Sequence, residues 1–172
     1  MNEPRAVVVD PPWKYTNSAT RNAAAKQYAL MTIEELEGIK IEAADDAHLY
    51  LWTTVGFIEE AFRLMRAWGF TYKTLLTWQK PQMGMGNYFR VNSEHVLFGV
   101  RGKLPTLRKN CPTVFTAPRQ RHSAKPDMFY DLVESMTPGP YREYFSRRPR
   151  LGWQCEGLES NGRDIRRAAE CG

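Results

Sequence analysis

The chain has 172 residues, of which 42% are hydrophobic and 12% aromatic, and this length suits one domain. This apolar content is enough for a buried core, which excludes disorder as a description of the whole chain. The formal net charge of +5 is compatible with a polyanionic partner but does not establish one.

The first expected element is a short strand at residues 6–9, where one alanine precedes three valines. Two prolines follow Asp10 directly and prevent further regular strand pairing. Asp10 should therefore lie at the carboxyl end of a strand, which is where open α/β sheets bind their ligands. Residues 16–26 are small and polar, and we expect a mobile loop that becomes ordered on binding.

Helical and strand patterns alternate through the rest of the chain. Thr32 with Glu35 forms a capping-box pattern, which predicts the start of a short helix. The expected strands are residues 48–52, 70–78, 94–100 and 144–145. The longer helices are expected at residues 57–68 and 127–136. A further short segment begins at residue 152. Residues 80–88 contain Pro81, Gly84 and Gly86 and are expected to form a flexible loop, and residues 110–126 are expected to be a basic loop. In the second longer helix we expect Met128, Phe129, Leu132, Val133 and Met136 to share one side.

This alternation has neither an internal repeat nor a linker, so it indicates a single α/β layered domain. We place the domain at residues 1–160 and a basic tail at residues 161–172. For the basic cluster between Arg119 and Lys125 we favour contact with nucleic acid or a cofactor, whereas the tail reads as a solvated surface.

No apolar stretch approaches the roughly 20 residues needed to span a membrane, and the first residues lack the features of a signal peptide. We therefore expect a cytoplasmic protein with no membrane partner. The three cysteines, Cys111, Cys155 and Cys171, lie far apart, and no Cys/His pair has zinc spacing, so we expect reduced thiols and no bound metal. A metal site made of His95, Cys111 and His122 is an alternative that we do not favour.

The Asp10-Pro11-Pro12-Trp13 motif carries the groups that methylation of an adenine amine needs. The N6 lone pair is delocalised into the ring, and removing a proton from the neutral amine beforehand is costly. Two acceptors placed against the two N–H bonds make the nitrogen more tetrahedral and direct its lone pair at the methyl group. Asp10 offers a carboxylate as one acceptor, and a carbonyl held by the two prolines offers the other. Trp13 offers a flat surface, and stacking a base on an aromatic ring contributes roughly 1–3 kcal/mol.

A motif of four residues also has a purely structural interpretation. In that interpretation the prolines end a strand, Asp10 caps a turn and Trp13 packs in the core. The rest of the chain favours the catalytic interpretation.

Six segments of the chain, which together reach almost from end to end, resemble those of a known family. They are DPPWKY (residues 10–15), HLYLWTT (48–54), SEHVLFGVRGK (93–103), RQRHSAKPDMFYDLVESMTPGP (119–140), REYFSRR (142–148) and GWQCEGLE (152–159). On these segments the chain resembles the adenine N6-methyltransferases typified by the catalytic subunit of the eukaryotic mRNA methyltransferase, and especially their small bacterial and phage relatives. The resemblance implies an α/β, Rossmann-like, S-adenosylmethionine-dependent methyltransferase fold in permuted order, with the catalytic strand first and the cofactor motif late.

The resemblance also implies the residues of the site. The catalytic motif is Asp10, Pro11, Pro12 and Trp13. The residues implied for S-adenosylmethionine, whose product is S-adenosylhomocysteine, are Asp10, Lys125 at the methionine carboxylate, Phe145, Ser146 and Arg147 in a turn, and Glu159 at the ribose hydroxyls. The residues expected at the substrate are Trp13, Tyr15, Tyr28, Arg119 and His122, where the tyrosines could equally be packing residues of a loop. Leu158 departs from the family, which often has Asn there, so a ribose hydrogen bond is in doubt.

The leading hypothesis is an enzyme that methylates adenine N6 in nucleic acid, with DNA favoured because the compact chain resembles bacterial and phage members. RNA is the alternative substrate, since the contacts that distinguish the two are not visible in sequence. A non-catalytic, nucleic-acid-binding scaffold subunit is the alternative of a different class, although a scaffold does not need the acceptors of the Asp10 motif. The family also implies a homodimer, or a heterodimer with a related subunit.

Overall fold

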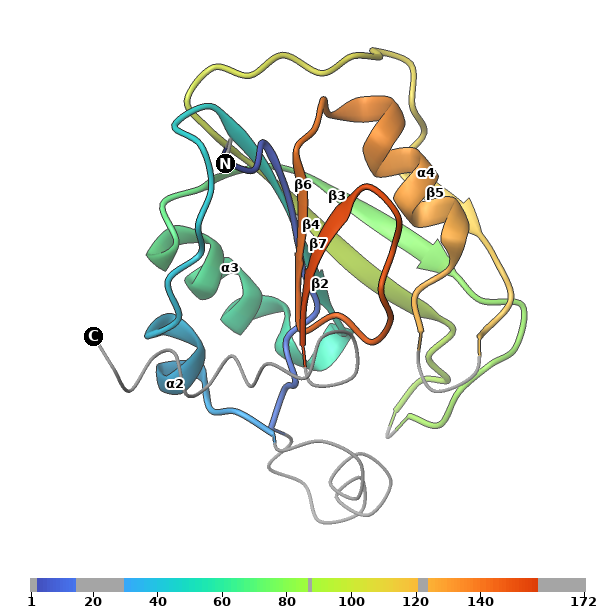
Figure 1. The fold of residues 1–172 in the computed structure, drawn as a ribbon. Coiled ribbons are helices and arrows are strands. Elements are labelled where there is room, and N and C mark those ends of the chain that lie inside the picture. Colours follow the sequence, from blue (N-terminus) through green and yellow to red (C-terminus); the bar gives the residue numbers. More distant parts are fainter. Residues whose placement is uncertain (1–2, 15–29, 87, 121–123, 158–172) are drawn as a thin grey trace.

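The computed structural model describes residues 3–14, 30–86, 88–120 and 124–157. In these ranges the chain forms one mixed sheet, with two helices against one face and one helix against the other (Figure 1). The loop expected at residues 16–26, the basic tail, and Tyr15, Tyr28, His122 and Glu159 lie outside the described residues. Within the described ranges, no helix is long and apolar enough to cross a membrane.

The sheet has seven strands in the order β5-β3-β4-β2-β1-β6-β7. In chain order they are β1 (Ala6–Val9), β2 (Ala47–Thr53), β3 (Thr71–Gln79), β4 (Ser93–Arg101), β5 (Val114–Thr116), β6 (Tyr141–Tyr144) and β7 (Trp153–Glu156). The helices are α2 (Ile33–Glu37), the 3₁₀ turn η1 (Val55–Phe57), α3 (Ile58–Ala67) and α4 (Asp127–Met136).

The strand directions bring most strand ends to one edge of the sheet. Strand β1 runs parallel to β2 and β6, while β4 runs antiparallel to both β2 and β3. β5 is parallel to β3, and β7 is parallel to β6. Every strand except β4 therefore points to the same edge, at which β4 begins. The chain leaves β1 towards β2 on one side and later returns to β6 on the other, which makes the end of β1 the topological switch point.

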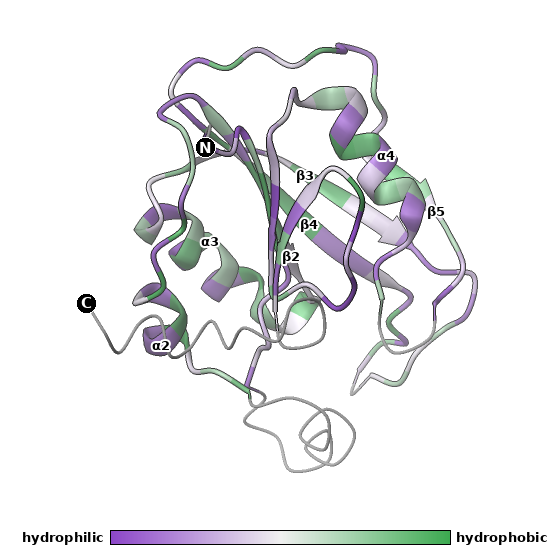
Figure 2. Ribbon diagram, in the orientation of Figure 1, coloured by the Kyte–Doolittle hydropathy of each residue, from purple (hydrophilic) through white to green (hydrophobic). Residues whose placement is uncertain are grey.

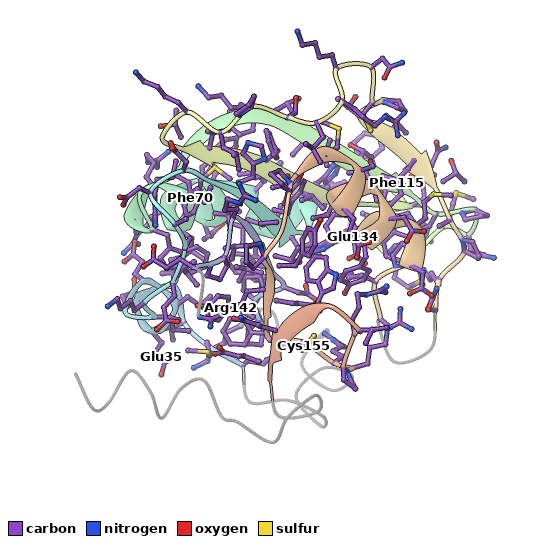
Figure 3. The ribbon with its side chains drawn as sticks, turned by 45° about the horizontal axis from the view of Figure 1, so that its top comes forward. Glu35, Phe70, Phe115, Glu134, Arg142 and Cys155 are labelled. Atoms are coloured by element: carbon purple, nitrogen blue, oxygen red, sulfur yellow. The ribbon has the colours of Figure 1, made fainter. Side chains whose placement is uncertain are left out.

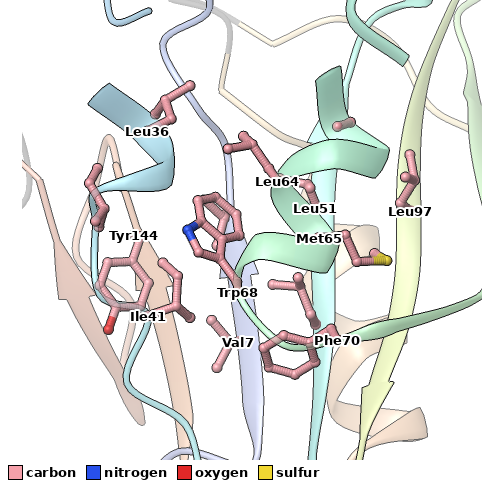
Figure 4. Close-up of a cluster of buried hydrophobic side chains, with 14 of the residues drawn as sticks. Val7, Leu36, Ile41, Leu51, Leu64, Met65, Trp68, Phe70, Leu97 and Tyr144 are labelled. Atoms are coloured by element: carbon pink, nitrogen blue, oxygen red, sulfur yellow. The ribbon is translucent and has the colours of Figure 1, made fainter. Parts of the chain in front are cut away.

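Two hydrophobic cores lie on opposite faces of the sheet because side chains alternate along each strand. Val7, Val9, Leu49 and Leu51 face α2 and α3, together with Trp68 (Figure 4). Ala6, Val8, Tyr50 and Trp52 face α4 and pack with Phe129. Phe70 of the first core and Phe115 of the second lie on opposite sides of the molecule (Figure 3). Hydrophilic and hydrophobic residues alternate along α3 and α4, as expected for helices with one buried side (Figure 2).

A buried polar network crosses the second core near the start of β2. The two ring nitrogens of His48 lie 2.8 Å from Thr137 Oγ1 and 2.9 Å from the Leu104 carbonyl oxygen. Tyr50 Oη lies 2.7 Å from the same Thr137 Oγ1. Burial lowers the pKa of His48, and the hydrogen bond to Leu104 offsets this only in part, so the ring is neutral at pH 7. A neutral ring that donates to Leu104 accepts from the threonine hydroxyl, which in turn accepts from Tyr50.

Most of the elements expected from the sequence are confirmed. The capping box is present, with Glu35 N donating to Thr32 Oγ1 and Thr32 N donating to the Glu35 carboxylate. The helix expected at residues 57–68 is α3, which ends just before Gly69 at φ +76°. The strands expected at residues 6–9, 48–52, 70–78 and 94–100 correspond to β1 to β4.

Three details differ from the expectation. Residues 110–126 are not all loop, because Val114–Thr116 forms β5 and adds to the free edge of β3. Strand β6 ends at Tyr144, so Phe145 lies in a turn with a positive φ of 62° and not in the strand. Met128 is 50% exposed, since the buried side of α4 is formed by Phe129, Tyr130 and Val133. The hydrogen bond from Tyr130 Oη to Glu143 draws this side towards β6 and away from Met128.

Candidate active site

Asp10 lies directly after β1, at the switch point of the sheet. Its Oδ1 is 3.1 Å from Lys125 Nζ, and its Oδ2 is 3.8 Å from Arg147 Nη2. Lys125 comes just before α4, and Arg147 follows β6. Three segments that are far apart in the sequence therefore place the Asp10 carboxylate between the cations of Lys125 and Arg147.

A second carboxylate, Glu94, extends this arrangement. Glu94 Oε2 is 2.8 Å from Lys125 Nζ, and Glu94 Oε1 accepts a hydrogen bond from Lys80 Nζ. Lys80 follows β3 and Glu94 is the second residue of β4, so both side chains sit at the same sheet edge as Asp10. The result is a row of alternating charges, Lys80, Glu94, Lys125, Asp10 and Arg147, which we call the ion row.

Tryptophan rings form the wall beside the ion row. Lys125 Nζ lies 4.5 Å from the centre of the Trp52 ring, and Lys80 Nζ lies 4.6 Å from that of Trp78. An ammonium over an aromatic face is attracted by the ring quadrupole. Trp52 Nε1 is buried and has no hydrogen-bond partner among the described residues. The row therefore lies against an aromatic surface that limits the access of water to the charges.

The charges in the row stabilise one another against burial. Burial by itself would raise the pKa of Glu94, but Lys125 and Lys80 outweigh it and lower that pKa to about 2. Burial by itself would lower the pKa of Lys125, but Asp10 and Glu94 outweigh it and raise that pKa. Both groups are therefore charged at neutral pH.

Two backbone hydrogen bonds fix the segment after Asp10. Trp13 N donates to the Pro11 carbonyl at 2.9 Å, and Met31 N donates to the Pro12 carbonyl at 2.9 Å. The Trp13 ring stacks on Phe57, with the ring centres 5.1 Å apart and the planes inclined by 11°. Only 7% of Trp13 is exposed, so its ring anchors the motif to the core. Stacking of a base on Trp13 stays a prediction.

The turn after β6 reaches Asp10 through Arg147. Phe145 takes the positive φ, and Ser146 N then donates to the Glu156 carbonyl of β7 at 2.9 Å. A Cβ on Gly157 would overlap the backbone of Ser146, so the end of β7 approaches this turn as closely as a glycine allows. Beneath the turn, burial raises the pKa of Glu143, although hydrogen bonds from Tyr130 and Ser146 partly offset it. The turn expected at residues 145–147 is thus held by β6 and β7 together.

The structure places the other expected site residues as follows. Arg119 lies against the loop between β3 and β4, where a Cβ added to Gly84 would be 2.9 Å from its guanidinium. Sequence analysis missed Glu94 and Lys80. The available signal was a charged residue at each end of the connection between two expected strands, which the topology brings to the edge where Asp10 lies.

A mixed sheet whose strands end together at an Asp-Pro-Pro-Trp motif, with the returning strand β6 beside it, defines the class of Rossmann-like methyltransferases that use S-adenosylmethionine. Within that class the family can be assigned. Residues 4–159 match the MT-A70 family, and the chain belongs to it. The protein is a methyltransferase of permuted motif order, as the sequence predicted.

Individual relatives match along nearly the whole chain. The type II methyltransferase M.MunI of Mycoplasma sp is 30% identical over 179 residues, which cover 90% of this chain and 77% of that relative. The N(6)-adenosine-methyltransferase catalytic subunit METTL3 of Homo sapiens is 25% identical over 178 residues, which cover 92% of this chain and 29% of that relative. A probable N(6)-adenosine-methyltransferase MT-A70-like protein of Oryza sativa subsp. japonica is 25% identical, covering 91% of this chain and 23% of that relative. The chain thus spans less than a third of these two eukaryotic relatives.

Proposed function

We propose that this methyltransferase transfers a methyl group from S-adenosylmethionine to the N6 amine of adenine in nucleic acid, with DNA as the favoured substrate. The observation that carries the proposal is the Asp10 carboxylate, held between two cations directly before the Pro11 carbonyl. The names of the eukaryotic relatives specify N(6)-adenosine. DNA is favoured because the chain matches most of a compact bacterial type II methyltransferase.

The described residues fit the methyl donor implied by the family. S-adenosylmethionine supplies an electrophilic methyl group on a sulfonium, and its amino-acid end carries an ammonium and a carboxylate. Asp10 offers a carboxylate for an ammonium, and Lys125 and Arg147 offer cations for a carboxylate. Asp10 and Glu94 accept from the Lys125 ammonium, and the Trp52 ring lies against it, so its charge is held in place before a ligand arrives.

The chain's own groups can orient the amine without removing its proton first. The Asp10 carboxylate accepts one N–H of the amine, and the Pro11 carbonyl accepts the other. The Pro11 oxygen already accepts from Trp13 N, and this bond fixes its direction while its second lone pair stays available. Because transfer makes the nitrogen cationic, the proton is lost afterwards, when little driving force is needed. Preorganised acceptors of this kind provide most of the rate in many enzymes.

The test is methylation by the purified chain with labelled S-adenosylmethionine and separate oligonucleotides of duplex DNA, single-stranded DNA and RNA. We expect label on adenine N6, more on DNA than on RNA, and a loss of about 100-fold or more in rate for Asp10→Ala, which removes the acceptor. Asp131→Ala, which truncates an exposed aspartate on α4, is the matched control and should retain the wild-type rate.

Each arm of this test can contradict a separate part of the proposal. Label that survives Asp10→Ala would contradict the assigned role of Asp10. Label on cytosine would remove the base assignment, and label on RNA alone would remove the preference for DNA. Measurable binding of S-adenosylmethionine without label on any substrate would favour the scaffold subunit. The roles of Tyr15, Tyr28, His122 and Glu159, the pairing with a second subunit and the cytoplasmic location stay predictions.

A further inference from the structure

The connection between β3 and β4 carries an unusual concentration of exposed hydrophobic side chains. The exposed fractions are 73% for Met83, 88% for Met85, 97% for Tyr88 and 85% for Phe89. These are four of the ten large hydrophobic residues that are exposed in the described part of the chain, and they fall within seven positions. Single exposed hydrophobic residues are normal, whereas a cluster of this kind marks a binding surface.

Backbone contacts bring together the two described arms of this loop. At its base, Lys80 N donates to the Asn92 carbonyl at 2.7 Å, and Gly84 N donates to the Val91 carbonyl at 2.6 Å. A Cβ on Gly84 would lie 2.8 Å from the Val91 oxygen, and one on Gly86 would overlap the Phe89 carbonyl. Only glycine permits this doubling back, which keeps Met85, Tyr88 and Phe89 away from the core.

Two arginines lie against the same loop. Arg90 Nη1 is 3.5 Å from Met85 Sδ, and the Arg119 guanidinium borders Gly84. Together with Met83, these residues line an open hollow of about 360 Å³. Among the described residues, no carboxylate lines this hollow, and the charged groups that line it are two guanidinium groups. We call Met83, Met85, Tyr88, Phe89, Arg90 and Arg119 the arginine–aromatic loop.

The arginine–aromatic loop lies next to the catalytic edge. It follows Lys80, which is the first member of the ion row, and it precedes Glu94, which is the second. In the fold the loop extends to the same side of the sheet as the end of β1 (Figure 1). A substrate strand bound with its target base at Asp10 would therefore pass close to this loop.

We propose that Tyr88 and Phe89 stack on bases that flank the target adenine, while Arg90 and Arg119 bind the adjoining phosphates. This inference rests on the proposed function. Aromatic faces next to guanidinium groups suit a nucleic-acid strand, because its bases stack on rings and its phosphates accept paired N–H donors. The absence of carboxylates from the hollow matches a polyanion. The target base must leave its stack to reach Asp10, so the neighbouring bases lose stacking energy. Stacking of these bases on aromatic rings beside the site offsets that loss.

The test measures binding separately from methylation. Fluorescein-labelled single-stranded and duplex DNA oligonucleotides are titrated with the full chain, and the affinity is read by fluorescence anisotropy. We expect the double variant Tyr88→Ala/Phe89→Ala to bind about 10-fold or more weakly. Arg90→Gln and Arg119→Gln should each reduce the slope of log affinity against log salt by about one. Leu151→Ala, which truncates an equally exposed residue outside the loop, should bind as the wild type does.

The outcomes separate this inference from the proposed function. Unchanged affinity and salt slope in all loop variants, with circular dichroism showing intact folds, would overturn it while leaving methylation at Asp10 standing. A loop variant that changes the sedimenting mass of the protein but not the DNA affinity would also overturn it, because the loop would then bind a second protein chain. If the wild type methylates no substrate but the loop variants still bind DNA more weakly, the role of the loop in binding nucleic acid is supported. Only the proposed function is then contradicted.

Discussion

At the scale of single residues, the site depends on how Asp10 shares its charge. Its two oxygens face different cations, Lys125 from the segment before α4 and Arg147 from the turn after β6. Lys125 in turn shares its charge with Glu94. A change at Glu94 therefore reaches Asp10 through one buried ammonium, even though the two carboxylates have no direct contact.

Glu94→Gln should destabilise the protein at neutral pH by up to about 3 kcal/mol. The pKa of Glu94 is about 2 in the folded protein against 4.5 for the free side chain. A lowered carboxyl pKa contributes stability that is present above pH 4.5 and is lost as pH falls towards 2. Urea unfolding should therefore show a smaller difference between the variant and the wild type at pH 3 than at pH 7.

The control for this measurement is Glu59→Gln, which neutralises an exposed glutamate of α3. It should change the free energy of unfolding by no more than a few tenths of a kcal/mol. A difference between Glu94→Gln and wild type that is equally large at both pH values would show that packing, and not charge, explains the effect.

Sequence reasoning brought Asp10, Lys125 and Arg147 together because each one lies in a distinctive motif. The sequence alone did not identify Glu94 and Lys80 as site residues. Each looks like an ordinary charged residue at the end of a strand, and its importance comes from the register between β3 and β4, which pairs Gln79 with Ser93. That register brings the two neighbouring side chains into contact with each other, and Glu94 in turn contacts Lys125 from a remote segment.

At the scale of elements, the turn after β6 depends on β7. The end of β7 lies so close to Ser146 that Gly157 has no room for a side chain. Gly157→Ala should therefore displace this turn and weaken S-adenosylmethionine binding by about 10-fold to 100-fold, since small displacements at a ligand site are costly. Isothermal titration calorimetry with S-adenosylmethionine measures the effect.

Gly56→Ala is the matched control, because a Cβ at Gly56 meets no atom within 4 Å. Wild-type affinity is expected for this variant. If Gly157→Ala binds the donor as tightly as Gly56→Ala does, the turn at residues 145–147 does not hold the donor.

The longer elements were predictable because they combine a sustained periodicity with end signals, as α3 does with its apolar spacing and Gly69. Strand β5 was missed since three residues are too few to establish a period. Its pairing depends on tertiary contacts, which include the bond from Trp78 Nε1 to the Ala117 carbonyl at 2.8 Å. The strand expected at residues 144–145 extends one residue too far, because a positive φ in a non-glycine residue such as Phe145 leaves no mark in the sequence.

At the scale of the whole molecule, the buried network around His48 makes the stability of the fold sensitive to pH. The pKa of His48 is lowered by burial from 6.5, so the unfolded chain binds this proton more readily than the folded protein does. Its contribution to stability is present above pH 6.5 and is lost as pH falls, with a slope of up to about 1.4 kcal/mol per pH unit. Burial also lowers the pKa of His95, which adds to this effect, while the raised pKa of Glu143 acts in the opposite direction.

The contribution of His48 is isolated by comparison with His48→Gln, which keeps hydrogen-bonding groups but does not titrate. Between pH 7.5 and pH 5.5, the free energy of unfolding in urea should fall by less in the variant than in the wild type. His95→Gln, measured in parallel, separates the second histidine. Equal losses in His48→Gln and in the wild type would show that the buried ring is not the source of the pH dependence.

The position of β1 at the centre of the sheet has a consequence for how the protein is made. β1 leaves the ribosome well before β6, which pairs Tyr141 with Ala6. At ordinary rates of synthesis the interval between them is roughly 7–27 s. During that time the strand of alanine and valines that leads to Asp10 has an unpaired edge, which is a site for association between nascent chains. Slower translation of the later segments should therefore lower the yield of native protein, even though the finished molecule covers that edge completely.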